Sequence, residues 1–89
     1  DAAQCADIAA RSYDTLAGLS EISPQIGEPE MRELVTELDL KPAQVFGVLR
    51  VAVTGQRVSP PLFESMEIIG KEKVLERIKA AETMLRAAA

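Results

Sequence analysis

Hydrophobic residues recur at intervals of three and four along most of the chain, with charged residues between them. This period is typical of amphipathic helices, whose apolar stripe faces a core. In the span 29–38, for example, Met31, Leu34, Val35 and Leu38 stand at positions i, i+3, i+4 and i+7. The whole pattern predicts helices at roughly 2–19, 29–38, 42–54, 60–69 and 71–86.

Proline and glycine mark the ends of these predicted helices. Pro29 and Pro42 suit the first position of a helix, where the missing N–H has no partner in any case. Gly55 suits a left-handed residue that ends the third helix, and Gly70 separates the last two. Proline before and glycine after the span 42–54 favour a helix there, although its valines would also suit a strand.

The strongest local signal is the segment VSPPLF at 58–63. Ser59 is a good N-cap, Pro60 suits the first helical position, and Val58 and Phe63 have the spacing of a hydrophobic staple. We therefore expect a rigid corner at which the fourth helix begins.

Composition then limits the architecture and the chemistry. With 89 residues, 47% of them hydrophobic and only 3% aromatic, the chain predicts one all-α domain over 1–89, a compact bundle or cage of about five short helices with an aliphatic core. No apolar run approaches the length of a membrane span. The first residues, DAA, contain no methionine and no basic region, so we interpret the chain as a fragment and not as one with a signal peptide.

The residue inventory excludes several kinds of catalytic and metal site. With no histidine and the single cysteine Cys5, the chain cannot form a Ser-His-Asp triad, a Cys-His pair or a zinc finger. Glu64 and Glu67 are interpreted as solvent charges, and the sequence around Gly70 lacks the earlier glycine of a phosphate loop. We expect no catalytic residue and no metal ligand.

Charge is divided unevenly between the two parts of the chain. Residues 1–40 contain nine acids and two bases, a net charge of −7, whereas residues 41–89 contain eight bases and five acids, a net charge of +3. Only the second part is suited to face a polyanion. The overall charge of −4 disfavours a helix-turn-helix DNA-binding protein.

Arg50 interrupts the most apolar predicted helix. A buried, unpaired guanidinium is very costly, so Arg50 must reach the edge of the core or meet an anion or a base. An ordinary surface arginine with a buried stem remains one interpretation. The polar loop that follows suggests another, a platform for an unstacked base. A phosphate cradle is less favoured, because Pro60 and Pro61 would remove two amides from the helix start.

Four segments together resemble a known family. They read RSYDTL at 11–16, LDLKPAQVFGVLRVAVTG at 38–55, VSPPLF at 58–63 and GKEKVLERI at 70–78. In this order they are similar to the C-terminal end of bacterial-type glutamyl-tRNA synthetases, which are class I glutamate–tRNA ligases. Asp39 stands where family members often have glycine, and we expect it to adopt the left-handed conformation.

The resemblance implies an anticodon-binding domain that selects tRNA and performs no chemistry itself. It implies that ATP and Mg²⁺ act in the catalytic domain of the parent ligase, that the partners are tRNA and the remainder of the synthetase chain, and that neither DNA nor a membrane is bound. A cytoplasmic location is also implied. The alternative is a helical protein-interaction domain, suggested by the acidic first part and the aliphatic stripes.

The resemblance also implies the residues of the site. Arg50 and Ser59 would form hydrogen bonds with anticodon nucleotides, Leu62 would contact a base through its apolar side chain, and Pro60 and Pro61 belong to the same loop. Candidate contacts to the RNA backbone are Lys41, Gln44, Arg57 and Lys71.

Overall fold

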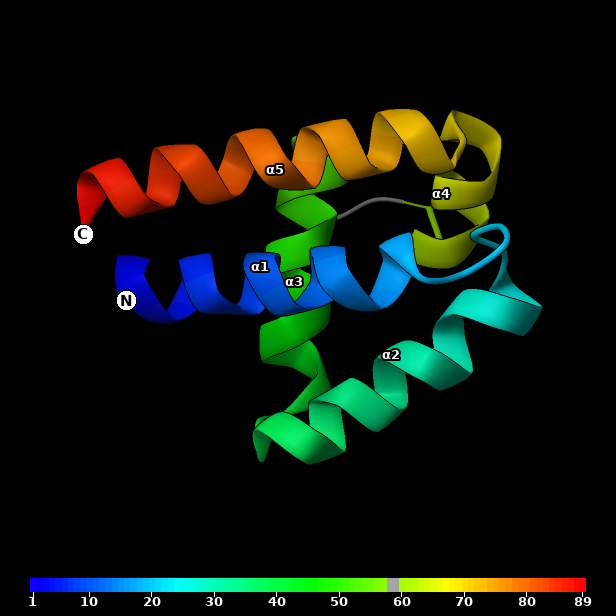
Figure 1. Ribbon diagram of the computed structural model, residues 1–89, viewed down its shortest axis with the longest axis horizontal. Coiled ribbons are helices and arrows are strands. Elements are labelled where there is room, and N and C mark those ends of the chain that lie inside the picture. Colours follow the sequence, from blue (N-terminus) through cyan, green and yellow to red (C-terminus); the bar gives the residue numbers. More distant parts are fainter. Residues whose placement is uncertain (58–59) are drawn as a thin grey trace.

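Helices account for nearly all of the chain that is described. The computed structural model describes residues 1–57 and 60–89, and within these ranges it has five α-helices and no strand. They are α1 (Ala2–Ala17), α2 (Pro24–Leu38), α3 (Pro42–Thr54), α4 (Leu62–Ile69) and α5 (Lys71–Ala88) (Figure 1). The predicted all-α cage is confirmed.

The two ends of the chain form the central helix pair. α1 and α5 run antiparallel, so both termini lie at the same end of the molecule (Figure 1). α1 buries the small residues Ala6, Ala9 and Ser12, while α5 buries Val74 and Ile78, all five fully inaccessible. Small side chains on one helix let the larger aliphatic side chains of the other approach closely, which makes this the most extensive contact in the fold.

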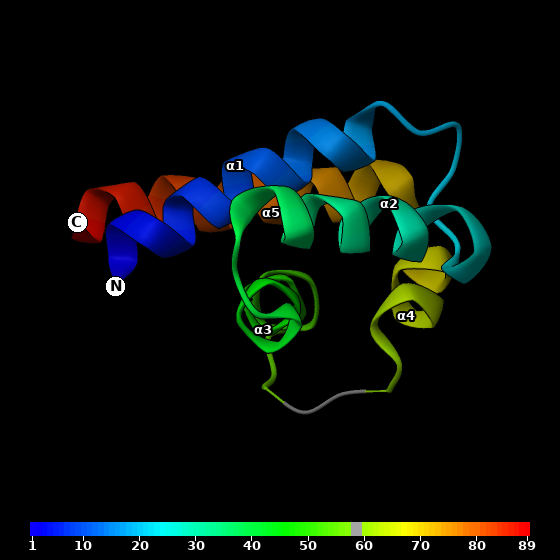
Figure 2. The same cartoon turned by 90° about the horizontal axis from the view of Figure 1, so that it is seen from below.

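α3 crosses this pair, and α2 and α4 close the cage around it. Viewed along its axis, α3 lies beneath the α1–α5 pair, with α2 and α4 to one side (Figure 2). Its core residues are Val45, Leu49 and Val53, spaced by four, which are at most 1% exposed. Val48 and Ala52, on the same helix, are only half-buried. α3 therefore has a side that the rest of the chain leaves uncovered.

Two aromatic rings hold α4 against α3 and α2. The rings of Phe46 on α3 and Phe63 on α4 meet edge to face, with centroids 5.7 Å apart. On α2, a Cβ added to the buried Gly27 would lie 3.2 Å from the Phe63 ring, so a larger residue there would require the ring to shift by a few tenths of an ångström. The guanidinium of Arg32 lies 5.4 Å from the centre of the Phe46 ring and covers it.

The predicted start of the second helix is wrong. α2 begins at Pro24 and not at Pro29, because the Ser23 hydroxyl accepts a hydrogen bond from the Ile26 amide at 3.2 Å and Pro24 takes the first helical position. Pro29 lies inside the helix. Its ring removes one backbone hydrogen bond, but Pro29 is exposed, so water can reach the carbonyl that loses its partner.

The predicted start of the fourth helix is also wrong. α4 begins at Leu62, with Pro61 as its N-cap, so Pro60 lies before the helix and not in its first turn. A residue that precedes proline is disfavoured in the α region, which keeps Pro60 out of the helix. The predicted cap at Ser59 and the staple from Val58 lie outside the described residues. Of the other bounds, only two differ from the prediction, each by two residues: α1 ends at Ala17, and α5 continues to Ala88.

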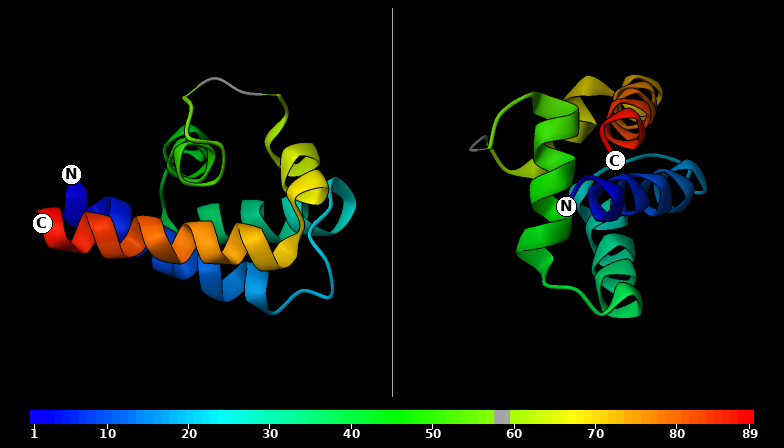
Figure 3. Two further views of the ribbon diagram at one scale, coloured as in Figure 1. Left: turned by 90° about the horizontal axis from the view of Figure 1, so that it is seen from above. Right: turned by 90° about the vertical axis from the view of Figure 1, so that its left-hand side faces the viewer.

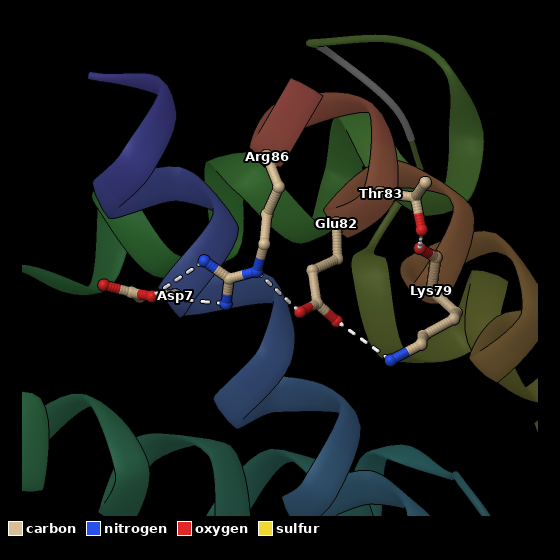
Figure 4. Close-up of polar contacts among 5 residues, drawn as sticks. All are labelled: Asp7, Lys79, Glu82, Thr83 and Arg86. Atoms are coloured by element: carbon tan, nitrogen blue, oxygen red, sulfur yellow. Dashed lines mark hydrogen bonds and ion pairs between the residues drawn. The ribbon is translucent and has the colours of Figure 1, made fainter. Parts of the chain in front are cut away.

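An ion-pair network joins the first half of α1 to the C-terminal half of α5. The Arg86 guanidinium donates to Asp7 through both terminal nitrogens at 3.3 Å and to Glu82 through Nε at 3.0 Å, while Lys79 lies 3.4 Å from the other Glu82 oxygen (Figure 4). The hydrogen bond from Arg86 is the main reason that the pKa of Glu82 lies below its usual value, and the same bond raises the pKa of Arg86. The network tethers the two ends of the chain.

The lowered pKa of Glu82 predicts the direction of a pH effect. A carboxyl whose pKa is lower in the folded state stabilises the fold above its unfolded pKa, and this stabilisation disappears as the pH falls through the folded pKa. Urea unfolding of the wild-type chain and of Glu82→Gln should therefore differ most near neutral pH and converge in acid. A constant difference at all pH values would show that Glu82 acts through packing and not through its charge.

The Ser12 hydroxyl predicts a stabilising substitution. Its oxygen is fully buried and has no hydrogen-bond partner among the residues that the structure describes. An unsatisfied buried polar group costs about 1–3 kcal/mol, so Ser12→Ala should raise the free energy of unfolding by about 1 kcal/mol, measured by urea denaturation. Ser12→Val should lower it, because valine adds a second branch at the Cβ of a fully buried residue, where α1 and α5 are in close contact. If Ser12→Ala were destabilising, the hydroxyl would have a partner after all.

Candidate nucleic-acid interface

The turn that ends α3 is organised by one hydroxyl and one glycine. The Thr54 hydroxyl donates to the Arg50 carbonyl at 2.6 Å and accepts from the Gln56 amide at 3.2 Å. Gly55 has a φ of 75°, in the left-handed region, and its N–H donates to the Val51 carbonyl at 2.9 Å. The predicted glycine end of this helix is confirmed. These hydrogen bonds fix the path of the backbone from Thr54 to Gln56.

A side chain of α5 also holds this turn. Arg77 Nη1 donates to the Val53 carbonyl at 2.7 Å, a contact between residues 24 positions apart. The last carbonyls of a helix have no partner within the helix, and a positive charge near them is favourable. Arg77 thus fixes the end of α3 relative to the central pair. Sequence reasoning did not find this role of Arg77.

The structure places Arg50 in the last turn of α3, half-buried. This agrees with the expectation that its side chain reaches the edge of the core. Arg57 is exposed on the turn that follows, and Pro60 and Pro61 are exposed before α4. Ser59 lies outside the described residues. Arg57 and the two prolines thus belong to the connection between α3 and α4, and Arg50 lies in α3 before this connection begins.

Leu62 faces the core and not the surface. It is 4% exposed and belongs to the same buried cluster as Phe63 and Met66. Almost none of its side chain is available to a base, so the structure does not support the base contact that the resemblance implied for it. The signal was present in the sequence, because Leu62, Phe63 and Met66 have the spacing of a buried helix face.

The expectation that the two prolines would remove amides from the helix start is also wrong. Both precede α4, so the amides of its first turn belong to Leu62, Phe63 and Glu64. The Glu64 carboxylate occupies this first turn, where it satisfies the positive end of the helix dipole. A phosphate cradle here remains disfavoured, but the reason is this acidic side chain.

The candidate backbone contacts do not form one surface. Lys41 and Gln44 lie at the beginning of α3, nine and six residues before Arg50, which corresponds to about 14 and 9 Å along the helix axis. The Gln44 side chain accepts from the Lys41 amide at 3.2 Å and so helps to begin the helix. Lys71 donates from Nζ to the Leu19 carbonyl at 2.5 Å, just beyond the end of α1. Of these four candidates, only Arg57 lies beside Arg50 in the chain.

Asp39 adopts the conformation predicted for it. It follows α2 with φ 56° and ψ 42°, the left-handed region, and its N–H donates to the Thr36 carbonyl at 3.1 Å. Aspartate tolerates this region better than most residues. The tight turn between α2 and α3 survives without glycine and sets the direction in which α3 crosses the central pair.

The part of the chain that the structure describes contains no candidate metal site and no candidate membrane span. No group of three or more acidic, cysteine or histidine side chains there is placed to hold a metal ion. No helix in 1–57 or 60–89 combines the length and the apolar character needed to cross a membrane.

Comparison with known proteins defines the class to which this fold and interface belong. The family described as "Anticodon binding domain" matches residues 1–82, so the chain belongs to this family. Three glutamate–tRNA ligases are similar to it: those of Roseiflexus castenholzii (48% identical over 84% of this chain), Dehalococcoides mccartyi (46% over 79%) and Corynebacterium jeikeium (41% over 91%). The chain spans only 14–16% of the length of these curated relatives.

The contact between Arg77 and Val53 yields a prediction about the α3 turn. A hydrogen bond from a charged group contributes about 1.5–3 kcal/mol, so Arg77→Met should speed amide hydrogen exchange at 54–56 by roughly tenfold or more. Lys73→Met, at an exposed position on the same helix, is the matched control and should leave the turn unchanged. Equal exchange in the two variants would mean that the turn holds its shape without Arg77.

Proposed function

We propose that this chain is the C-terminal anticodon-binding part of a glutamate–tRNA ligase and that it selects the tRNA to which glutamate is attached. The observation that carries the proposal is the fixed turn at the end of α3: Arg50 precedes this turn, and the exposed Arg57 follows it on the connection that leads to the exposed Pro60 and Pro61. The family match and the glutamate–tRNA ligase relatives support it. They do not favour a helical protein-interaction domain.

Recognition would occur at unpaired anticodon bases. A guanidinium presents several N–H donors in a fixed plane and can form two hydrogen bonds with a base edge, which contributes about 1–3 kcal/mol of discrimination. The exposed rings of Pro60 and Pro61 offer a stiff apolar surface against which a base can pack. Ser59, between the arginines and the prolines, would add a hydrogen bond. Leu62 would support this loop from the core.

Such a site selects and does not catalyse. A few contacts of this size bind weakly by themselves, and attachment to the rest of the ligase would supply the effective concentration that makes them useful. We assign the binding of ATP, Mg²⁺ and glutamate to the part of the ligase outside this chain. A cytoplasmic location is part of the same proposal.

Steady-state aminoacylation by the full-length ligase tests the role of Arg50. Arg50→Ala should lower kcat/KM for glutamate-accepting tRNA roughly tenfold or more, because each 1.4 kcal/mol of lost contact energy is a factor of ten. The KM values for glutamate and ATP should stay the same. The variant should also discriminate less between tRNAs that differ at one anticodon base. Lys73→Ala, which removes one exposed charge from α5, is the control. Unchanged tRNA kinetics in Arg50→Ala would remove Arg50 from the site.

A further inference from the structure

An apolar groove runs along the side of α3 that the cage leaves uncovered. It has a volume of about 720 Å³ and lies between α3, the C-terminal half of α5 and the beginning of α1. Val48 and Val51 form one wall, and Ala81, Met84 and Leu85 form the other. Met84 is 73% exposed and Val51 is 48% exposed, although both are large hydrophobic residues. Exposed apolar side chains that gather in one groove mark a surface that another structure covers.

A glycine in this groove adds an independent observation. Gly47 lies in the interior of α3, where glycine costs about 1 kcal/mol relative to alanine. It has an ordinary helical φ, and a Cβ added to it would meet no atom within 4 Å. Neither backbone conformation nor packing within the described residues therefore requires glycine at this position. A bare backbone in an apolar groove is suited to the close approach of a side chain from outside.

The position of the groove indicates what occupies it. Cys5 and Ala88 also line it, so it extends to the end of the molecule where both termini emerge (Figure 3, right). The relatives are far longer than this chain, which spans 15% of one and 14% of another. If the chain is the C-terminal part of such a ligase, the remaining length precedes Asp1 and enters the molecule beside this groove.

We infer that the groove is the docking surface for the part of the ligase that precedes Asp1, with an apolar helix of that part seated on α3 and α5 and a large side chain against Gly47. This inference rests on the proposed function. The docked segment would fix how the anticodon-binding turn, at the end of the same helix α3, is oriented relative to the rest of the ligase. Docking would be apolar, because Arg77 is the one charged residue among those that line the groove.

Cross-linking in the full-length ligase tests the occupant. A photoreactive phenylalanine analogue at position 84 should cross-link within the same chain, to peptides that precede Asp1, as identified by mass spectrometry. The matched control is position 68, because Ile68 on α4 is 85% exposed but lies outside the groove. The yield at position 84 should exceed that at position 68 roughly tenfold. Cross-links from position 84 to a second copy or to tRNA, or a yield no higher than at position 68, would overturn the inference.

A second variant separates loss of docking from loss of folding. Gly47→Leu places a side chain in open space and favours the helix, so it should not destabilise the chain described here. In the full-length ligase it should block the groove, reduce the cross-link from position 84 and speed amide exchange over 80–88 roughly tenfold. Unchanged cross-linking and exchange would show that nothing occupies the groove.

The two proposals fail in distinguishable ways. If the purified ligase charges tRNA with glutamate but the cross-links from position 84 do not map before Asp1, the docking inference is wrong and the function stands. If the purified protein cannot attach glutamate to tRNA, the proposed function is wrong, wherever the cross-links map.

Discussion

The close contact between α1 and α5 is the constraint on which the rest of the fold depends. Ala6, Ala9 and Ser12 are small enough for α5 to approach along the whole of α1, and the two helices bury Val74 and Ile78 between them and α3. This contact joins the first and last residues of the chain. It also places the basic side chains of α5 next to elements that lie far from them in the sequence.

Those basic side chains act mainly within the fold. Lys71 donates to the carbonyl of Leu19, Arg77 to that of Val53, and Arg86 to the carboxylate of Asp7. The net positive charge of residues 41–89 therefore overstates what a polyanion would meet. A surface of this kind suits the selection of a few bases better than general attraction to phosphate, which needs many free cations. This surface fits the proposed function, in which the domain contributes specificity for the tRNA and the rest of the ligase contributes affinity.

α3 has two roles, one at its end and one along its side. Its last turn carries Arg50 and is fixed by Thr54 and Arg77. Its uncovered side carries Gly47 and Val51. If the turn binds the anticodon as proposed and the groove is occupied as inferred, the same rigid helix connects the binding turn to the rest of the proposed ligase. A change in how the docked segment sits in the groove would then reorient the turn at the end of α3, with no rearrangement inside the domain.

The number and type of the helices followed from the sequence alone, because an apolar period of three and four residues and the placement of proline and glycine are local properties. The bounds of α3, the left-handed conformations of Asp39 and Gly55 and the position of Arg50 at the core edge were predicted in this way. The starts of α2 and α4 were not predicted correctly, because more than one residue near each start is able to act as the N-cap. Only the tertiary structure decided that Arg77 holds the α3 turn and that Met84 and Val51 border one groove. Each of these depends on which helix faces which, and the packing of small side chains between the two ends of the chain sets that arrangement.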